Sequence, residues 1–145
     1  MRIRVGITID ASPRDTWNVV EPIEHHVDWM ADARTIRFTG SQTRGAGTTF
    51  DCVTMVGPLR LTDRMTVTEW EPGRLMGIEH HGVVTGRGRF TLRRRRGGRT
   101  RFTWNERLSF PWWMGGAIGA TAAKPILRAI WRRNLRRLKV IVEAT

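Results

Sequence analysis

The chain has 145 residues, a net charge of +12 at pH 7 and one cysteine. This length fits one domain, here residues 1–145, which can bury about 70% of the surface of the unfolded chain around a single core. Cys52 alone cannot form an internal disulfide, no run reaches the ~20 apolar residues of a membrane span, and the apolar content is too high for a disordered tail. Because the chain starts with alternating residues and not with an apolar secretory signal, we expect a cytoplasmic protein.

The first 30 residues predict a strand followed by two short helices. Apolar side chains alternate with polar ones over residues 3–9, which indicates a strand with one buried face. Ser12 and Asp15 then form a capping box, in which Asp15 reaches back to the cap amide, for a helix that ends near residue 20. After a Glu-Pro break, residues 23–30 predict the second helix.

Residues 35–110 consist of short β segments separated by glycine and proline. This pattern predicts six strands in antiparallel succession. Within residues 59–67 and 102–108 apolar side chains alternate with arginine and threonine. One face of the sheet should therefore be apolar and the other polar.

The last segment, residues 112–143, has the periodicity of a long helix with an apolar stripe. Pro125 lies inside it and should kink or restart the helix, because its ring clashes with the preceding turn. Three glycines upstream weaken the first turns, so we expect a loose beginning and a firm helix after the proline. The predicted order is strand, two helices, six strands and one helix, an α+β fold.

Four short motifs within this order look familiar. They are residues 7–13 (ITIDASP) followed by Trp17, residues 23–26 (IEHH) leading to Trp29, residues 69–75 (EWEPGRL) and residues 134–139 (NLRRLK). With them, the chain resembles the START-related helix-grip superfamily, which includes polyketide cyclase/dehydrase proteins and aromatase/cyclases. The resemblance implies a seven-stranded curved antiparallel sheet wrapped round the long C-terminal helix, with a cavity for a lipid, sterol, polyketide or other hydrophobic molecule. A sheet with one apolar face agrees with this, since a single helix cannot fill the whole concave side.

Three polar side chains fall on the apolar face. The alternation turns Asp63 and Glu106 inward, and the register of Ile78 brings His80 inward as well. These residues either hold a polar group of a ligand or, if His80 titrates near neutrality, transfer protons. The alternative is that backbone amides, arginines or water satisfy each of them. A β-bulge would turn Arg64 inward in place of Asp63, and aromatase/cyclases use an inward arginine on a comparable strand.

The predicted ligand-binding set combines these polar candidates with apolar residues of the strands and the last helix. It consists of Trp29, Phe50, Leu61, Asp63, Met65, Ile78, His80, Phe90, Trp104, Glu106, Leu127, Trp131 and Asn134. Asn134 is alternatively a satisfied core amide. The resemblance also places His25 or His26 at the cavity mouth. We expect neither a metal nor a cofactor, because the histidine pairs lack metal-ligand spacing.

The positive charge is concentrated in the second part of the chain. Residues 1–86 carry 9 basic and 11 acidic side chains, whereas residues 87–145 carry 16 basic and 2 acidic ones. Arg93, Arg94, Arg95 and Arg96 precede a Gly-Gly turn and form a predicted hairpin tip, which either contacts an anionic membrane or RNA or is simply a solvated surface.

Trp112, Trp113 and Met114 form an apolar cluster within this basic part. The cluster either enters a membrane interface, forms a mobile lid or acts as a hydrophobic staple at the cavity end. A homodimer through this cluster or through a strand edge is compatible with the sequence, which does not require one.

These observations favour a protein that binds a hydrophobic small molecule in an internal cavity, as a carrier or sensor. The alternative is a polyketide cyclase/dehydratase-type enzyme that uses Asp63, His80 and Glu106 as acid and base. A second alternative is an interaction module that binds RNA, a ribosome or a membrane through its arginines. The fold alone does not decide between them.

Overall fold

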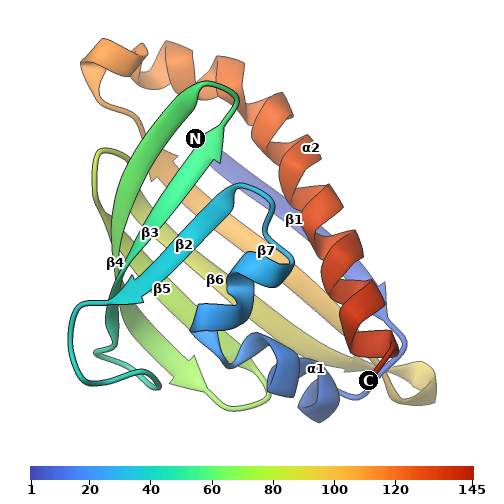
Figure 1. The fold of residues 1–145 in the computed structure, drawn as a ribbon. Helices are drawn as coiled ribbons and strands as arrows, with labels where there is room; N and C mark the ends of the chain where they lie inside the picture. Colours follow the sequence, from blue (N-terminus) through green and yellow to red (C-terminus); the bar gives the residue numbers. More distant parts are fainter.

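Seven strands form one antiparallel sheet in the computed structural model, which describes residues 1–145, and the long α2 helix lies across it (Figure 1). The spatial order is β1-β7-β6-β5-β4-β3-β2, so β1 and β2 are the two edges. The α+β class and the helix-grip arrangement are thereby confirmed. The elements are β1 (Arg2–Ile9), α1 (Pro13–Val20), the 3-10 helix η1 (Ile23–Asp28), β2 (Ala33–Phe38), β3 (Thr49–Val56), β4 (Leu59–Glu71), β5 (Leu75–His81), β6 (Thr85–Arg95), the 3-10 turn η2 (Arg96–Gly98), β7 (Arg99–Ser109), the 3-10 turn η3 (Trp112–Met114) and α2 (Gly116–Glu143).

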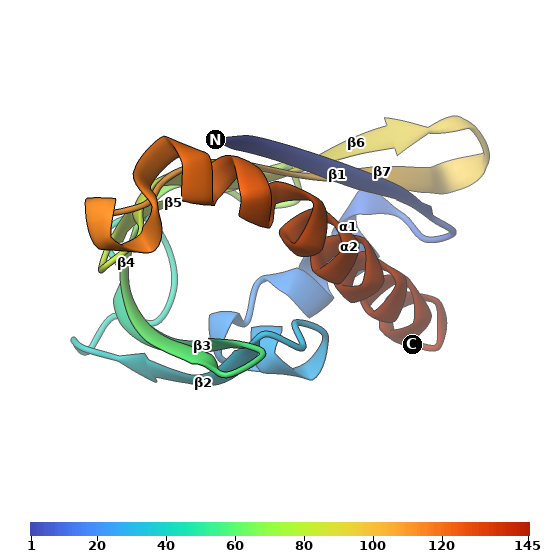
Figure 2. The ribbon, with the colours of Figure 1, turned by 90° about the horizontal axis from the view of Figure 1, so that it is seen from above.

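The sheet is strongly curved. Figure 2 shows it passing from β1, β7 and β6 through β5 and β4 to β3 and β2 on the opposite side, with α2 running across the concave side. The short helices α1 and η1 lie on the concave side near the C-terminal end of α2. Helix α2 packs mainly against β1 and β7, whereas β2 lies against η1, and the interior between β2, β3 and α2 is where the site forms.

The capping residues of α1 follow the sequence pattern only in part. The Ser12 hydroxyl accepts a hydrogen bond from the Asp15 amide at 3.1 Å, and Pro13 occupies the first helical position. The Asp15 carboxylate makes no reciprocal bond to the cap amide, so only one half of the predicted capping box exists. The second predicted helix is the 3-10 helix η1 and ends at Asp28, two residues earlier than expected.

Helix α2 is continuous from Gly116 to Glu143, with Pro125 inside it. The helix therefore does not restart at the proline. Figure 1 shows it changing direction within its first part, as a proline that cannot donate to the preceding turn is expected to cause. The buried residues of α2 lie mostly after Pro125 and include Trp131, Leu135 and Leu138.

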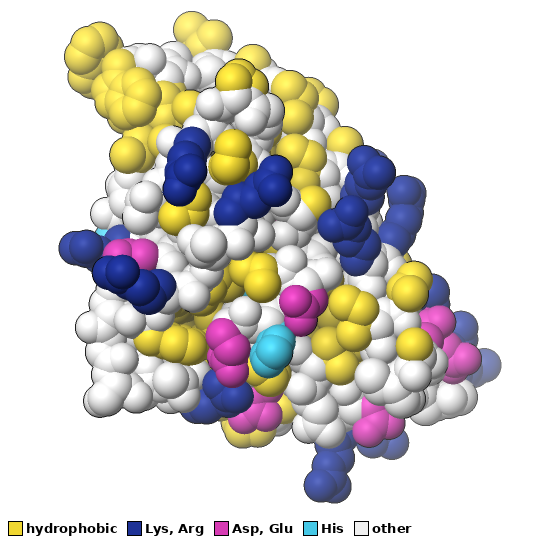
Figure 3. Space-filling model, in the orientation of Figure 1, with side chains coloured by type: hydrophobic (Ala, Val, Ile, Leu, Met, Phe, Trp, Pro, Cys, Tyr) yellow, Lys and Arg dark blue, Asp and Glu magenta, His cyan; other side chains and the backbone are white.

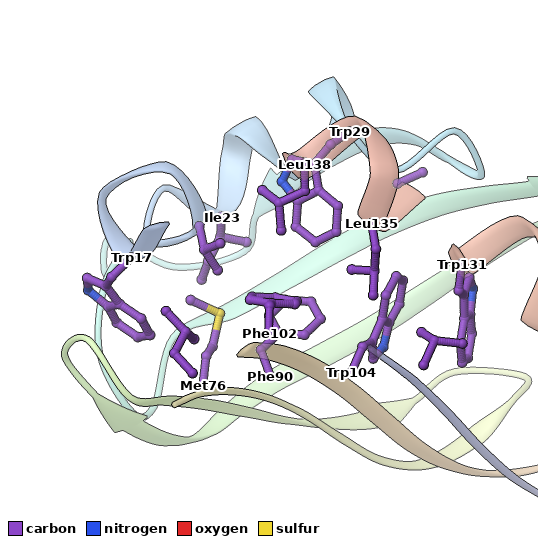
Figure 4. Packing of buried hydrophobic residues seen from close by; sticks show 14 of the residues in the cluster. Trp17, Ile23, Trp29, Met76, Phe90, Phe102, Trp104, Trp131, Leu135 and Leu138 are labelled. Carbon is purple, nitrogen blue, oxygen red and sulfur yellow. The ribbon is translucent and has the colours of Figure 1, made fainter. Parts of the chain in front are cut away.

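The core is an aromatic cluster between the sheet and the second part of α2 (Figure 4). The ring of Trp29 packs edge-on or tilted against Phe90, Phe102 and Trp104, with centroids 5.7, 6.3 and 6.1 Å away. Trp104 is stacked on Trp131 with centroids 4.5 Å apart and planes at 12°. Such pairs stabilise a core beyond the area that they bury, and here they join β6 and β7 to α2.

Candidate functional site

A cavity of about 230 Å³ lies between the curved sheet and α2. It is lined by 28 residues, of which 21 are hydrophobic. The lining comes from η1, from strands β2 to β7 and from the middle of α2. The alternation within each strand thus produces an apolar concave face that one helix covers only in part.

Most of the predicted ligand-binding residues line this cavity. They are Phe50, Leu61, Asp63, Met65, Ile78, His80, Phe90, Trp104, Glu106, Leu127 and Trp131. Two predicted members, Trp29 and Asn134, are wrong as cavity residues. Trp29 is fully enclosed by the aromatic core, because it follows η1 into the space beneath α2. Asn134 is fully buried and satisfied elsewhere.

The amide of Asn134 connects α2 to the segment before β2. Its Nδ2 donates to Asp32 Oδ1 at 2.8 Å, and its Oδ1 accepts from the amide of Ala31 at 3.0 Å. Trp131 Nε1 donates to the other oxygen of Asp32 at 3.3 Å. Asp32, which the sequence analysis did not include, lines the cavity. The only feature of the sequence that could have pointed to Asp32 is its position close to the buried Trp29.

Three predicted polar residues form a continuous hydrogen-bonded row in the cavity wall, the Asp63–His80–Glu106 chain. Asp63 Oδ2 lies 3.0 Å from His80 Nδ1, and Glu106 Oε2 lies 2.9 Å from His80 Nε2. The second oxygen of Glu106 accepts from Trp104 Nε1 at 3.0 Å. The predicted inward orientation of the three side chains is confirmed, and their direct contact is an additional finding.

Two glycines of β6 allow the histidine and the glutamate to meet. His80 on β5 is opposite Gly86, and Gly88 is opposite Glu106 on β7. A Cβ atom at Gly88 would lie 2.3 Å from the carboxylate of Glu106, closer than any real contact. Because these positions have no side chain, residues of β5 and β7 contact each other across the intervening strand. The sequence indicated this contact only through Gly86 and Gly88, which lie two residues apart on the same face of β6.

His80 is held as an imidazolium at neutral pH. Burial favours its neutral form, but the hydrogen bonds to Asp63 and Glu106 and their negative charges outweigh burial and raise its pKa to about 10. Both ring N–H groups therefore donate to carboxylates. The proton-transfer hypothesis required His80 to titrate near neutrality. With this pKa, His80 does not meet that condition.

The alternative register of β4 is wrong. No bulge occurs at position 63, and Arg64 points to the outer face, where its Nε lies 3.3 Å from Asp51. The irregularity of this strand lies further on, between Val67 and Glu69 where β4 pairs with β5. The cavity wall therefore contains the acid, and the arginine is outside.

Of the first histidine pair, His26 lines the cavity and His25 faces outward. His26 Nε2 lies 2.7 Å from the carbonyl oxygen of Val20, so this nitrogen carries the ring proton and donates. Burial lowers the pKa of His26 to about 4 and keeps the ring neutral. His25 is instead paired with the exposed carboxylate of Asp28.

The Asp63–His80–Glu106 chain does not have the geometry of a metal site. The two carboxylates contact opposite nitrogens of one ring, so their oxygens do not converge on a common point. No group of three or more His, Cys, Asp or Glu side chains is arranged to hold a metal ion. Cys52 lines the cavity as a free thiol, and burial raises its pKa to about 11.

The hydrophobic staple proposed for the tryptophan cluster is wrong. Trp112 and Trp113 are 87% and 56% exposed and do not line the cavity. Figure 3 shows hydrophobic side chains gathered at the end of the molecule where α2 begins, at the upper left of this view. Contacts of this surface with a membrane or with a second copy of the chain stay predictions.

The arginine run forms the predicted hairpin tip between β6 and β7. Arg93 to Arg96 are exposed, and Gly97 and Gly98 both have positive φ angles, 73° and 71°, that favour glycine in the turn. RNA or anionic lipid as the partner of this tip stays a prediction. None of the helices is both long enough and apolar enough to cross a bilayer.

The fold and the lined cavity define a helix-grip protein, and the comparison with known families agrees. The family described as polyketide cyclase/dehydrase and lipid transport matches residues 1–143, and the chain belongs to it. No curated protein matches the chain in sequence.

Solved structures share the fold at low sequence identity. A protein from Thermus thermophilus has a TM-score of 0.82 and 15% identity, with 99% of this chain and 98% of that chain covered. A conserved protein from Geobacillus kaustophilus has a TM-score of 0.82 and 10% identity, covering 99% and 96%. XoxI from Bacillus cereus has a TM-score of 0.75 and 12% identity, covering 97% and 94%. At such identities these structures support the fold and not a shared ligand.

Proposed function

We propose that this protein binds a hydrophobic small molecule in its internal cavity, as a carrier or sensor. The observation that supports this most is the cavity of about 230 Å³ with its largely apolar lining. Since a dry apolar cavity of about 150 Å³ takes up benzene, a molecule of roughly two fused rings fits here. The family description, which includes lipid transport, agrees with this proposal.

The rim of the cavity gives such a molecule an apolar approach. Leu59 and Ile126 belong to the lining and are 43% and 57% exposed, so the cavity wall continues to the surface between the β3–β4 turn and α2. Deeper inside, the stacked rings of Trp104 and Trp131 form part of the wall. Flat aromatic faces favour ring systems over long flexible chains.

The test compares two tryptophan substitutions one residue apart on α2. Ala123 lines the cavity and Ala122 is exposed, so Ala123→Trp should fill the cavity while Ala122→Trp adds the same side chain outside. We expect the natural chain and Ala122→Trp to bind tetralin equally in calorimetric titrations, and Ala123→Trp to bind at least tenfold more weakly. Equal binding of tetralin by both variants would overturn the proposal, as would a natural chain that binds neither tetralin nor its charged derivatives.

The second candidate is an enzyme of the cyclase/dehydratase type. One carboxylate oxygen of Asp63 favours it. Asp63 Oδ1 has no hydrogen-bond partner, so the Asp63 carboxylate keeps a capacity to accept a proton, which a base requires. Both N–H groups of His80 are already bound, so His80 cannot serve as the base. Exchange of the protons next to the carbonyl of 2-tetralone in D₂O tests this candidate. Equal exchange with the natural chain and with Asp63→Asn counts against it.

A further inference from the structure

The Asp63–His80–Glu106 chain has already used all of its N–H donors within the protein. It can therefore offer a ligand only hydrogen-bond acceptors. His80 uses both of its N–H groups on the two carboxylates, and the indole N–H of Trp104 is used on Glu106. Asp63 Oδ1 has no hydrogen-bond partner, but it is covered on all sides, and a Cβ atom added at Gly82 would lie 2.9 Å from it. A ligand group that itself only accepts, such as a carbonyl, a carboxylate or a phosphate, finds no free donor at this place.

Two further polar residues of the cavity wall have the same character. The carboxylate of Asp32 accepts from Trp131 and Asn134, and an ionised carboxylate has nothing to donate. The neutral ring of His26 donates through Nε2 to the backbone, which leaves its Nδ1 as an acceptor without a hydrogen bond. The other two polar residues of the lining are Thr54 and Arg89, which can donate.

The charges of the wall are unbalanced in the same direction. Asp32, Asp63 and Glu106 line the cavity, and none of them forms an ion pair with an arginine or lysine. His80 supplies one positive charge between two of them. Arg89 also contributes to the lining, but its guanidinium bonds to Glu69 at 2.6 Å. A surplus of negative charge in an apolar enclosure is costly unless a cation joins it.

We propose that the ligand is an apolar amine whose protonated nitrogen donates to the carboxylate of Asp63 while its hydrocarbon part fills the rest of the cavity. This inference rests on the proposed binding function and names its ligand class. An ammonium group beside this carboxylate donates a hydrogen bond and reduces the surplus negative charge in one contact. An anionic ligand of the same shape meets the carboxylates of Asp32, Asp63 and Glu106. The interior thus has the opposite preference to the arginine-rich exterior.

The first experiment ranks three ligands with one carbon skeleton at pH 7. Calorimetric titrations use tetralin, 2-aminotetralin and tetralin-2-carboxylic acid, which are neutral, cationic and anionic. We expect 2-aminotetralin to bind at least tenfold more tightly than tetralin, since hydrogen bonds to charged groups are the strong ones, and the acid to bind more weakly than either. If tetralin binds and the amine binds no better, the amine inference is wrong while the binding function stands. If none of the three binds, the binding function itself fails.

The second experiment removes the charge at one atom. Asp63→Asn should weaken binding of 2-aminotetralin about tenfold or more, and weaken binding of tetralin by a smaller factor. Asp51→Asn is the matched control, because Asp51 lies on the outer face, and the variant changes the net charge of the chain by the same amount. An equal loss of amine binding in both variants would assign the effect to overall charge and overturn the inference. The ranking of the three ligands by the natural chain decides the question even if Asp63→Asn does not fold.

Discussion

Raising the pH should withdraw a positive charge from between two carboxylates inside the protein, and the effect on stability has a predictable size. In the folded chain the pKa of His80 is about 10, against an ordinary value of 6.5. Below pH 6.5 the ring is protonated in both the folded and the unfolded chain, and its stabilising contribution is fully present. Above pH 6.5 the unfolded chain loses the proton while the folded chain keeps it, so stability falls until the pH passes 10.

The free energy of unfolding should therefore decrease by about 1.4 kcal/mol per pH unit between pH 6.5 and 10. Over the whole window this amounts to about 5 kcal/mol, comparable with the total stability of many small domains. A neutral glutamine at position 80 cannot lose a proton. His80→Gln should be less stable than the natural chain near pH 6.5, and the difference should shrink as the pH rises.

Urea unfolding followed by tryptophan fluorescence, at half-unit steps from pH 6 to 10, measures both curves. The natural chain minus His80→Gln isolates the histidine, because every other titrating group is common to both. Parallel curves would refute the reasoning, since they would mean that His80 has lost its proton at the same pH in the folded and unfolded chains. The nitrogen chemical shifts of the ring provide a direct check of its protonation.

Three further predictions concern residues around the cavity. Burial lowers the pKa of His26 to about 4, so between pH 6.5 and 4 the unfolded chain binds a proton that the folded chain does not bind. The free energy of unfolding, measured by urea titration, should therefore fall by about 3 kcal/mol over this range. His26→Gln should remove that loss. Gly88→Ala should destabilise by about 3 kcal/mol in scanning calorimetry, because its methyl group would lie 2.3 Å from the carboxylate of Glu106 and displace it from a buried ion pair. Asn134→Leu should cost about 2 kcal/mol in denaturant titrations, since Asp32 and a backbone amide each lose a hydrogen-bond partner.

The glycine and asparagine substitutions each have a control at an exposed position. An added Cβ at Gly40 meets only Thr49 Oγ1 at 3.8 Å, so Gly40→Ala should stay within about 0.5 kcal/mol of the natural chain. Arg133→Leu changes an exposed neighbour of Asn134 and should be similarly mild. Equal effects of the two glycine substitutions would contradict the close approach of Glu106 to β6, and a flat acid limb in the natural chain would contradict a neutral His26.

Periodicity predicted the direction of side chains well and their neighbours poorly. Alternation within a strand fixes the face on which Asp63, His80 and Glu106 lie, because the period of two is a property of the strand itself. Their contact depends on the pairing of β4 with β5, of β5 with β6 and of β6 with β7, and on the glycines of β6. Pairing register is a long-range property that turns and bulges decide, and no local pattern states it.

The two incorrect cavity residues show a second limit of the sequence. Trp29 and Asn134 are both turned inward, as predicted, but the inside of this fold contains a packed core and an open cavity side by side. Which of the two an inward residue meets depends on where α2 crosses the sheet. Asp32 was missed for the same reason, because its importance comes from two donors on α2, about a hundred residues later in the chain.

The proline in α2 divides the helix into parts of unequal local stability. Pro125 has no N–H to give to the carbonyl of Thr121, and of the residues before it in the helix only Ala120 is buried, whereas five residues after it are buried. With two glycines in its first turns as well, residues 116–124 can separate from the sheet at a much smaller free-energy cost than residues 131–142. Amide protons of the first part should therefore exchange with solvent long before those of the second. Because Ala123 is part of the cavity lining, opening of this turn would give the proposed ligand a route in or out while the core stays folded.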